Sequence, residues 1–123
     1  MRYTAKAIST ATSLAALLGA LSFTMPAVSS AEASAIDEGM KIAFNRKKGN
    51  CLACHQIEGG SLPGNIGPPL LAMKARFPDK NKLRAQIADA RTTNVNTIMP
   101  PFGAHEILSA SEIDKVVEFI HSL

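Results

Sequence analysis

The sequence is poor in several residue types that shape small domains, since it contains no tryptophan, one tyrosine and two cysteines. It shows no internal repeat and no run of alternating apolar and polar residues, so it predicts no β-strands. Its most apolar stretch, residues 7–23, is shorter than the about 20 residues that a membrane-spanning helix needs. These absences favour an all-α domain and argue against a spanning helix.

Residues 1–33 have the features of a secretory signal peptide. Arg2 and Lys6 supply a basic start, and residues 7–23 form a short apolar stretch with no stop-transfer pattern after it. We therefore predict that this segment is removed during export. An uncleaved membrane anchor is the alternative.

Small residues mark two candidate cleavage sites, after Ala31 and after Ala33, of which we favour the second. The mature domain then covers residues 34–123 and is expected in the periplasm. It holds eleven Lys and Arg residues against nine Asp and Glu residues, a formal charge of +2. So small an excess indicates neither a nucleic-acid partner nor binding to a membrane surface after cleavage.

Both cysteines belong to one motif, Cys51-Leu52-Ala53-Cys54-His55, which is typical of covalent c-type haem attachment. Residues three apart on a helical turn share a face, so the two thiols can reach two vinyl groups on one edge of the porphyrin. His55 then offers an imidazole nitrogen to the iron. We predict one covalent haem, held by Cys51, Cys54 and His55.

Two other chemistries use such cysteine pairs. A redox-active CxxC motif is expected in a strand-rich fold, which this sequence does not predict. A zinc site needs four ligands, and His105 and His121 are the only other histidines. Haem attachment is the better interpretation.

Met99 is the predicted second axial ligand of the iron. It lies in Asn96-Thr97-Ile98-Met99-Pro100-Pro101, where the following proline biases it towards extended backbone. Met73, His105 or an open position are the alternatives. A thioether ligand opposite His55 raises the reduction potential and closes both axial positions to oxygen or substrate. This ligation indicates electron transfer.

The carbonyl of Pro68, in Gly67-Pro68-Pro69-Leu70, is the predicted acceptor for the second ring nitrogen of His55. Histidines that bind metals usually donate their other N–H to such a group, which fixes the ring. The alternative is that Gly-Pro-Pro forms a turn with no role at the haem.

Apolar periodicity and capping residues predict three to five helices joined by long loops that wrap the cofactor. Ser109 and Glu112 form a capping box for the last helix, which has an apolar stripe of Ile113, Val116, Val117 and Ile120. The other predicted segments are a helix from the N-cap Ser34 to Gly49, short helices within 70–77 and 80–90, and irregular loops over 56–70 and 92–103.

Together these features resemble the class I, mitochondrial-type cytochrome c family over the whole mature chain. The matching parts are an N-terminal helix with Gly39 and Phe44, the CxxCH motif, a Gly-Pro loop, a Met-Pro loop and a C-terminal amphipathic helix. The resemblance implies haem thioethers at Cys51 and Cys54, iron ligands at His55 and Met99, and a hydrogen bond from His55 to Pro68.

The sequence departs from that family in two respects. Phe44 lies farther ahead of the first cysteine than is common, which affects its expected packing. The mature chain also has no tyrosine or tryptophan to donate hydrogen bonds near the propionate and the methionine.

A narrower similarity is to the SoxX sulfur-oxidation cytochromes, over the stretches 49–55, 83–87, 96–103 and 107–120. In that family SoxX is the mono-haem subunit of the SoxAX complex. Its SoxA partner couples thiosulfate oxidatively to a cysteine of the SoxYZ carrier, and SoxX passes the electrons to a small cytochrome c. The resemblance implies an electron-accepting subunit of this kind. The alternatives are a free soluble electron shuttle or, with an open iron site, a peroxidase or gas sensor.

Two sets of residues are candidates for docking a partner at the haem edge. The favoured set is apolar and rigid: Gly59, Gly60, Pro100, Pro101 and Phe102. The other set is basic and could steer an acidic partner: Lys47, Lys48, Lys74 and Arg76.

Overall fold

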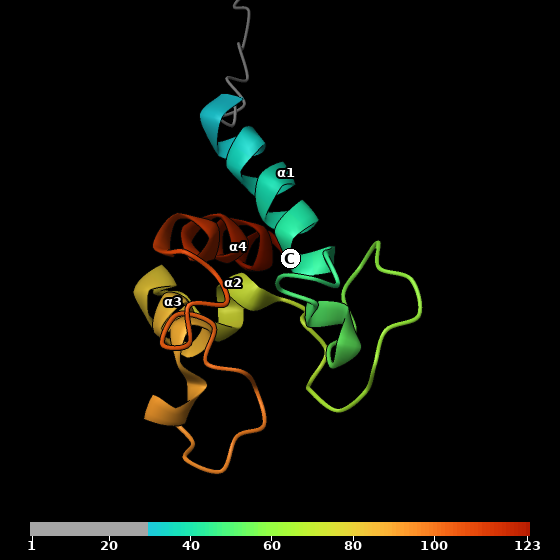
Figure 1. The fold of residues 1–123 in the computed structure, drawn as a ribbon. Helices are drawn as coiled ribbons and strands as arrows, with labels where there is room; N and C mark the ends of the chain where they lie inside the picture. The colour runs from blue at the N-terminus through green and yellow to red at the C-terminus, as the bar shows by residue number, and fades with distance from the viewer. Residues whose placement is uncertain (1–29) are drawn as a thin grey trace, which may run out of the picture.

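The structure, a computed structural model, describes residues 30–123, so nearly all of the predicted signal peptide lies outside it. Figure 1 shows α1 running down onto α4, with α2 and α3 close to α4 and two long loops beyond them. No strand occurs in residues 30–123, which confirms the all-α prediction. The elements are α1 (Ser30–Phe44), the 3-10 turn η1 (Cys51–Ala53), α2 (Met73–Arg76), α3 (Lys80–Ala88), the 3-10 turn η2 (Ala90–Thr92) and α4 (Ala110–Ser122).

Helices α1 and α4 pack closely because Gly39 leaves room between them. A Cβ at Gly39 would lie 2.0 Å from the backbone oxygen of Lys115, so a larger residue could fit only if a helix moved. Near the end of α1, the rings of Phe44 and Phe119 meet edge to face with centroids 5.6 Å apart. The unusual spacing of Phe44 from the cysteine motif therefore does not prevent it from packing on the last helix.

The last helix supplies much of the hydrophobic core. The predicted apolar stripe of α4 is buried over its whole length, together with Phe119. These side chains form one cluster with buried residues of the other elements: Ala43, Met73, Leu83, Ile87 and Phe102. The core thus joins all four α-helices and Phe102 of the irregular segment before α4.

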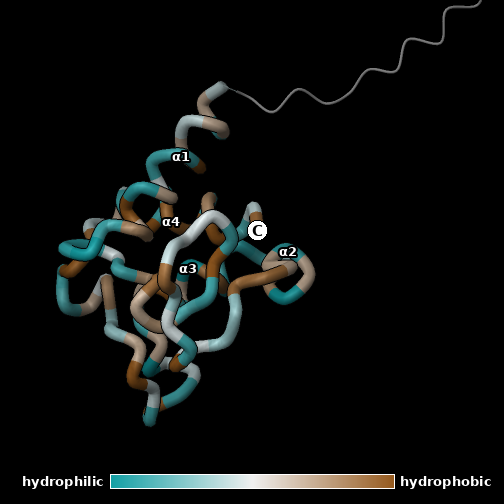
Figure 2. The backbone as a smooth tube through the Cα atoms, turned by 90° about the vertical axis from the view of Figure 1, so that its right-hand side faces the viewer, coloured by the Kyte–Doolittle hydropathy of each residue, from teal (hydrophilic) through white to brown (hydrophobic). Residues whose placement is uncertain are grey.

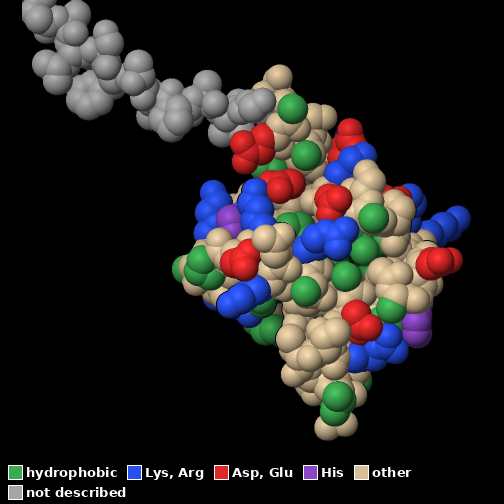
Figure 3. Space-filling view, turned by 90° about the vertical axis from the view of Figure 1, so that its left-hand side faces the viewer, with side chains coloured by type: hydrophobic (Ala, Val, Ile, Leu, Met, Phe, Trp, Pro, Cys, Tyr) green, Lys and Arg blue, Asp and Glu red, His purple; other side chains and the backbone are tan. Residues whose placement is uncertain are grey.

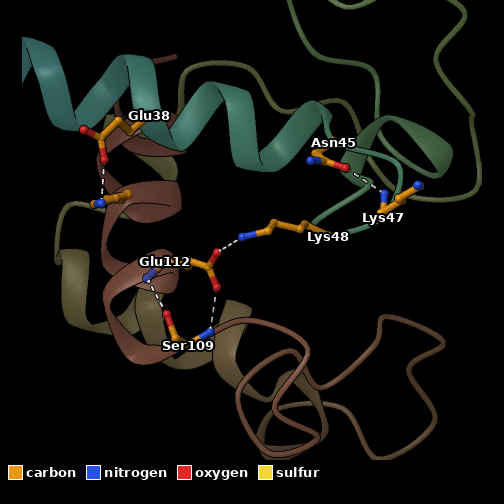
Figure 4. Close-up of polar contacts among 7 residues, drawn as sticks. Glu38, Asn45, Lys47, Lys48, Ser109 and Glu112 are labelled. Atoms are coloured by element: carbon orange, nitrogen blue, oxygen red, sulfur yellow. Dashed lines mark hydrogen bonds and ion pairs between the residues drawn. The ribbon is translucent and has the colours of Figure 1, made fainter.

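Polar contacts also tie α1 and its following turn to α4 (Figure 4). Ser109 and Glu112 form the predicted capping box, in which each side chain accepts the other residue's backbone N–H, at 3.3 and 3.0 Å. Glu112 also pairs with Lys48, and Glu38 of α1 pairs with Lys115 of α4. The cap of α4 is therefore linked to the chain just before the cysteine motif.

Both predicted ends of the first helix are wrong. Helix α1 begins at Ser30 rather than at Ser34, because the intervening alanines are strong helix formers. It ends at Phe44, and the left-handed residue that reverses the chain is Asn50, with φ 47°, rather than Gly49. Asparagine tolerates this conformation. Gly49 is instead needed for space, since it is buried against the end of α1.

Two irregular segments, residues 54–72 and 93–109, complete the fold; we call them the first and second loops. Figure 2, seen from the side of the first loop, shows hydrophobic stretches along the loops as well as along the helices. Among residues 30–123 no helix is both long and apolar enough to span a bilayer.

Candidate functional site

The CxxCH motif folds into the turn η1. The backbone N–H groups of Cys54 and His55 both donate to the oxygen of Cys51, at 3.2 and 2.9 Å. Residues three apart in a 3-10 turn stand above one another, so the two cysteine side chains lie on the same side. The left-handed Asn50 immediately before the turn sets its direction. The arrangement predicted for an α-helical turn is thus reached in a tighter 3-10 turn.

No disulfide joins Cys51 and Cys54, and the environment of Cys51 is unsuited to redox chemistry of its own. Burial raises the pKa of the Cys51 thiol to about 11, so the thiol stays protonated at neutral pH. Redox-active CxxC motifs have a lowered cysteine pKa instead. Within residues 30–123, no three His, Cys, Asp or Glu side chains gather into a metal-binding group. The alternatives of a dithiol and of a zinc site therefore gain no support.

The imidazole of His55 is fixed on two sides. Its Nδ1 donates a hydrogen bond of 2.7 Å to the backbone oxygen of Pro68, the contact predicted from the sequence. Gly67 lies directly against the ring, since a Cβ there would be 2.5 Å from the ring carbon Cε1. With Nδ1 engaged, Nε2 is the ring nitrogen left for a metal. In the sequence Gly67 is recognisable only as part of a turn, so its contact with the His55 ring was not predicted.

Two further glycines hold the first loop against the cysteine motif. The N–H of Gly64 donates to the oxygen of Leu52 at 2.7 Å, and a Cβ at Gly64 would lie 2.0 Å from the oxygen of Ala53. A Cβ at Gly60 would lie 2.3 Å from the Leu52 side chain. Gly64 is therefore required for close approach to the backbone, whereas at Gly60 a Cβ would meet only the flexible end of the Leu52 side chain at such short range.

Met99 lies in the second loop, partly buried and outside any helix. Its N–H donates to the hydroxyl of Thr97 at 3.1 Å, and the N–H of Thr97 donates to the oxygen of Asn94 at 3.1 Å. Beyond Met99, the N–H of Gly103 donates to the oxygen of Ala88 at the end of α3, at 2.8 Å. Local hydrogen bonds before the methionine and an anchor after it thus fix this loop.

The other candidate axial ligands are less well placed. Met73 is 2% exposed and belongs to the core, and its sulfur accepts a contact from Arg76 Nη1 at 3.4 Å. His105 is exposed and does not border the cavity described below. Met99 therefore remains the best candidate.

One cavity of about 780 Å³ is bordered by all five predicted site residues: Cys51, Cys54, His55, Pro68 and Met99. This volume falls within the about 300–1,000 Å³ that is usual for ligand and cofactor sites. Much of the remaining wall is apolar and comes from the core, including Leu83, Ile87, Phe102, Val116 and Ile120. Basic residues also border the cavity: Arg46, Lys47, Lys48 and Arg76.

Large hydrophobic side chains that are exposed gather on the two loops. In the described part of the chain they are Leu62, Ile66, Leu71, Val95, Ile98 and Ile107. Three of these, Ile66, Ile98 and Ile107, also border the cavity. The face on the side of α3 and α4 looks different, since basic and acidic side chains intermingle there and hydrophobic ones are scattered (Figure 3).

The predicted apolar rim is wrong at Phe102. This side chain is 6% exposed and packs in the core, because the N–H of Leu108 binds the Phe102 oxygen at 3.0 Å and folds the loop end inward. In the part of this loop that precedes Phe102, the exposed large apolar residues are Val95 and Ile98. They stand among Asn and Thr residues, which is the sequence signal that could have identified them.

Comparisons with known proteins agree with this geometry. The sequence model of the cytochrome c family matches residues 36–123. The structure is similar to a chain in the crystal structure of SoxXA from P. pantotrophus, with 32% sequence identity and a TM-score of 0.63. The match covers 70% of this chain and 79% of that chain. A search of curated protein sequences found no match. The chain therefore belongs to the cytochrome c family, whose members carry covalently bound haem c, and it is a SoxX-like electron-transfer cytochrome.

Proposed function

We propose that this chain is the electron-accepting haem subunit of a periplasmic complex that couples thiosulfate oxidatively to a cysteine of a carrier protein. The similarity to the SoxXA structure, at 32% identity over 79% of that chain, is the observation that carries this proposal. In this assignment a SoxA-like haem subunit performs the chemistry on the substrate, and this chain takes up the electrons. A small cytochrome c then accepts them.

The residues that border the cavity fit a covalently attached haem. Cys51 and Cys54 lie on one side of the turn η1, as attachment through two thioethers requires. His55 and Met99 would hold its iron through a nitrogen and a sulfur, and Pro68 fixes the ring of His55. When bound, the haem supplies a one-electron redox centre.

The protein's own contribution is to protect and tune that centre. With His55 and Met99 as ligands, the iron would be closed to oxygen and substrate, which favours electron transfer over bond-making chemistry. The apolar wall of the cavity would keep water away from most of the haem, and a sulfur ligand would favour the reduced state. A peroxidase or gas sensor would instead need an open axial position.

The exposed hydrophobic residues support a permanent partner rather than a transient one. Ile66, Ile98 and Ile107 border the cavity and are exposed, so they lie where a partner's redox centre would have to approach. Stable subunit interfaces are more apolar than those of shuttling proteins. Of the basic residues near the cavity, Lys48 is already paired with Glu112, so its charge attracts an acidic partner less strongly.

Copurification tests the proposal directly. The chain, expressed with its leader and tagged at its C-terminus, is isolated from the periplasm of a thiosulfate-oxidising bacterium and stained for covalent haem. We expect a second haem protein to copurify, and we expect the chain itself to carry haem and to be processed near Ala33. A monomer that never retains a second haem protein would favour the free shuttle.

Paired variants identify the docking surface. Ile66→Ser together with Ile98→Ser should weaken association at low and at high salt, with little change in the haem spectrum. Lys47→Glu is the matched control for steering, because Lys47 also borders the cavity. If Lys47→Glu has the larger effect and association collapses with added salt, the partner is a transient one.

A further inference from the structure

Leu62, in the first loop, combines two unfavourable properties. Its side chain is 89% exposed, the largest exposed fraction among the exposed large hydrophobic residues of the described chain. Its backbone has φ 52°, in the left-handed region, where the Cβ of a leucine crowds the following carbonyl oxygen. The other non-glycine residues with positive φ in residues 30–123 are an asparagine, an alanine and a glutamate. Leu62 is therefore the one large apolar residue that adopts this conformation there.

No contact within the described part of the chain offsets these costs. Residues 61–63 make no hydrogen bond between backbone groups, and Leu62 does not belong to the hydrophobic core. It does not border the cavity either. Backbone strain of this kind is found at functional sites, where it is part of how the site works. The position of Leu62 therefore calls for a function outside the fold itself.

The first loop holds Leu62 close to the cysteine motif. Gly60 and Gly64, two residues to either side, both lie against Leu52: a Cβ at Gly60 would be 2.3 Å from the Leu52 side chain, and the N–H of Gly64 donates to the Leu52 oxygen at 2.7 Å. Pro63 restricts the backbone between them. Leu52 stands between the two cysteines in η1, and the loop projects away from the helices (Figure 1). Leu62 is thus presented to solvent beside the turn that would attach the haem.

The surroundings of Leu62 indicate the kind of partner that it fits. Residues 59–73 contain no charged side chain, so a charged partner surface would find no opposite charge along this loop. Ile66, four residues after Leu62, is exposed and borders the cavity, which makes the apolar surface continuous in sequence with the mouth of the site. An uncharged apolar surface of this kind suits a permanently bound subunit better than a shuttling protein.

We propose that Leu62 is a preformed anchor for the haem-bearing partner subunit, and that its unfavourable backbone is retained because the side chain becomes buried in the complex. This inference rests on the proposed function, since it needs that partner. A side chain already held in its bound position loses little freedom on association. Because Leu62 lies beside η1, docking on it brings the partner to the edge of the cavity where the haem would be attached.

The test compares the holoproteins Leu62→Asn, Leu62→Met and Val95→Asn. Asparagine tolerates the left-handed conformation, so Leu62→Asn relieves the strain and removes the anchor, whereas Leu62→Met keeps both. Val95, in the second loop, is 82% exposed and has no positive φ, so Val95→Asn removes a comparable side chain without relieving strain. For each we measure the thermal unfolding midpoint, and the affinity for the second haem protein that copurifies with the parent.

Leu62→Asn should raise the unfolding midpoint by about 4–8 °C and weaken association by about 10–100-fold. Its haem spectrum should match the parent's, because Leu62, unlike the loop residues of the site, does not border the cavity. Leu62→Met should resemble the parent in both measurements. Val95→Asn should leave the midpoint unchanged and weaken association less than Leu62→Asn does.

Three results would overturn the inference. They are a Leu62→Asn protein that binds the partner as tightly as the parent, a Leu62→Asn protein whose midpoint does not rise, and a Val95→Asn protein that loses as much affinity as Leu62→Asn. Light scattering of the parent tests the other occupant: a homodimer that Leu62→Asn dissociates would show that a second copy of the chain covers Leu62. Failure of the proposed function is seen separately, because the parent itself would then retain no second haem protein.

Discussion

The helix pair α1 and α4 and the two loops are held together in different ways. The helix pair has continuous backbone hydrogen bonding, a buried apolar stripe, a close contact at Gly39 and an ion pair between Glu38 and Lys115. The loops are held by single hydrogen bonds and by glycines packed against backbone, yet they carry the predicted haem ligands and all the exposed large hydrophobic residues of the described chain. Stability is therefore concentrated in the helix pair, and the chemistry is concentrated in the loops.

This difference predicts that substitutions in the helix pair and in the loops affect different measured properties. Substitutions in the helix pair should change the free energy of unfolding and leave the haem spectrum of the folded protein as it is. Substitutions in the loops should change the spectrum or the potential with a smaller cost in stability. The cysteine motif and its histidine join the two regions, so changes there should affect both.

The largest effect is expected from His55→Ala, at that junction. Because ligation and folding are coupled, this variant should yield little stable holoprotein. Covalent haem in periplasmic extracts is measured by haem staining, relative to total chain on an immunoblot. His105→Ala is the control, since His105 is exposed and away from the cavity. A normal yield from His55→Ala would show that the histidine does not link the two regions.

Phe119→Ala tests the helix pair alone. Phe119 is 5% exposed, packs on Phe44 and does not border the cavity. Its truncation should cost about 3–5 kcal/mol in the free energy of unfolding, measured by guanidinium titration of the holoprotein. Phe119→Leu keeps most of the apolar volume and should cost less. If Phe119→Ala altered the haem spectrum of the folded protein as much as a loop substitution does, the separation of stability in the helices from haem chemistry in the loops would be contradicted.

Gly67→Ala tests the first loop. The added Cβ would meet the His55 ring at 2.5 Å, so the ring must turn or the loop must move. We expect altered NMR shifts of the axial histidine and a loss of about 1–3 kcal/mol in stability from overpacking. Gly59→Asn is the matched control, since Gly59 has φ +76° and open space where a Cβ would lie. Equal effects of the two substitutions would mean that loop strain, rather than contact with His55, is responsible.

The smallest effect is expected from the ion pair between Lys48 and Glu112, which links the segment after α1 to the start of α4. Lys48, and after it the Ser109 backbone, lowers the pKa of Glu112 from 4.5 to about 2. A lowered folded-state pKa stabilises the fold above pH 4.5, and this contribution is lost as the pH falls to about 2. Glu112→Gln and Lys48→Gln should each flatten the pH dependence of unfolding in that window. An unchanged slope in Lys48→Gln would show that Lys48 is not the cause.

The parts of this molecule that could be predicted from sequence are those set by short-range spacing. The CxxCH turn, the capping box at Ser109 and the Met-Pro loop each depend on a few neighbouring residues. The contact between His55 and Pro68 was also within reach, because proline limits the conformations of that segment.

The remaining features depend on contacts between distant segments. Phe102 follows two prolines in an irregular loop, and only the position of Leu108 shows that its side chain is buried. The contact of Gly67 with the His55 ring and the bond from Arg76 to Pro69 likewise join separate elements. No periodicity in the sequence reports such contacts.

The most direct test of the account is the weak red absorption band of ferric haem that arises from sulfur-to-iron charge transfer. The band is recorded in the parent holoprotein, in Met99→Ala and in Met73→Leu, which removes the other methionine that borders the cavity. We predict that the parent and Met73→Leu show the band. Met99→Ala should lose it, keep its covalent haem, fall in reduction potential and bind carbon monoxide in the ferrous state. A band that persists in Met99→Ala would show that Met99 is not the ligand and that the second loop does not hold the iron.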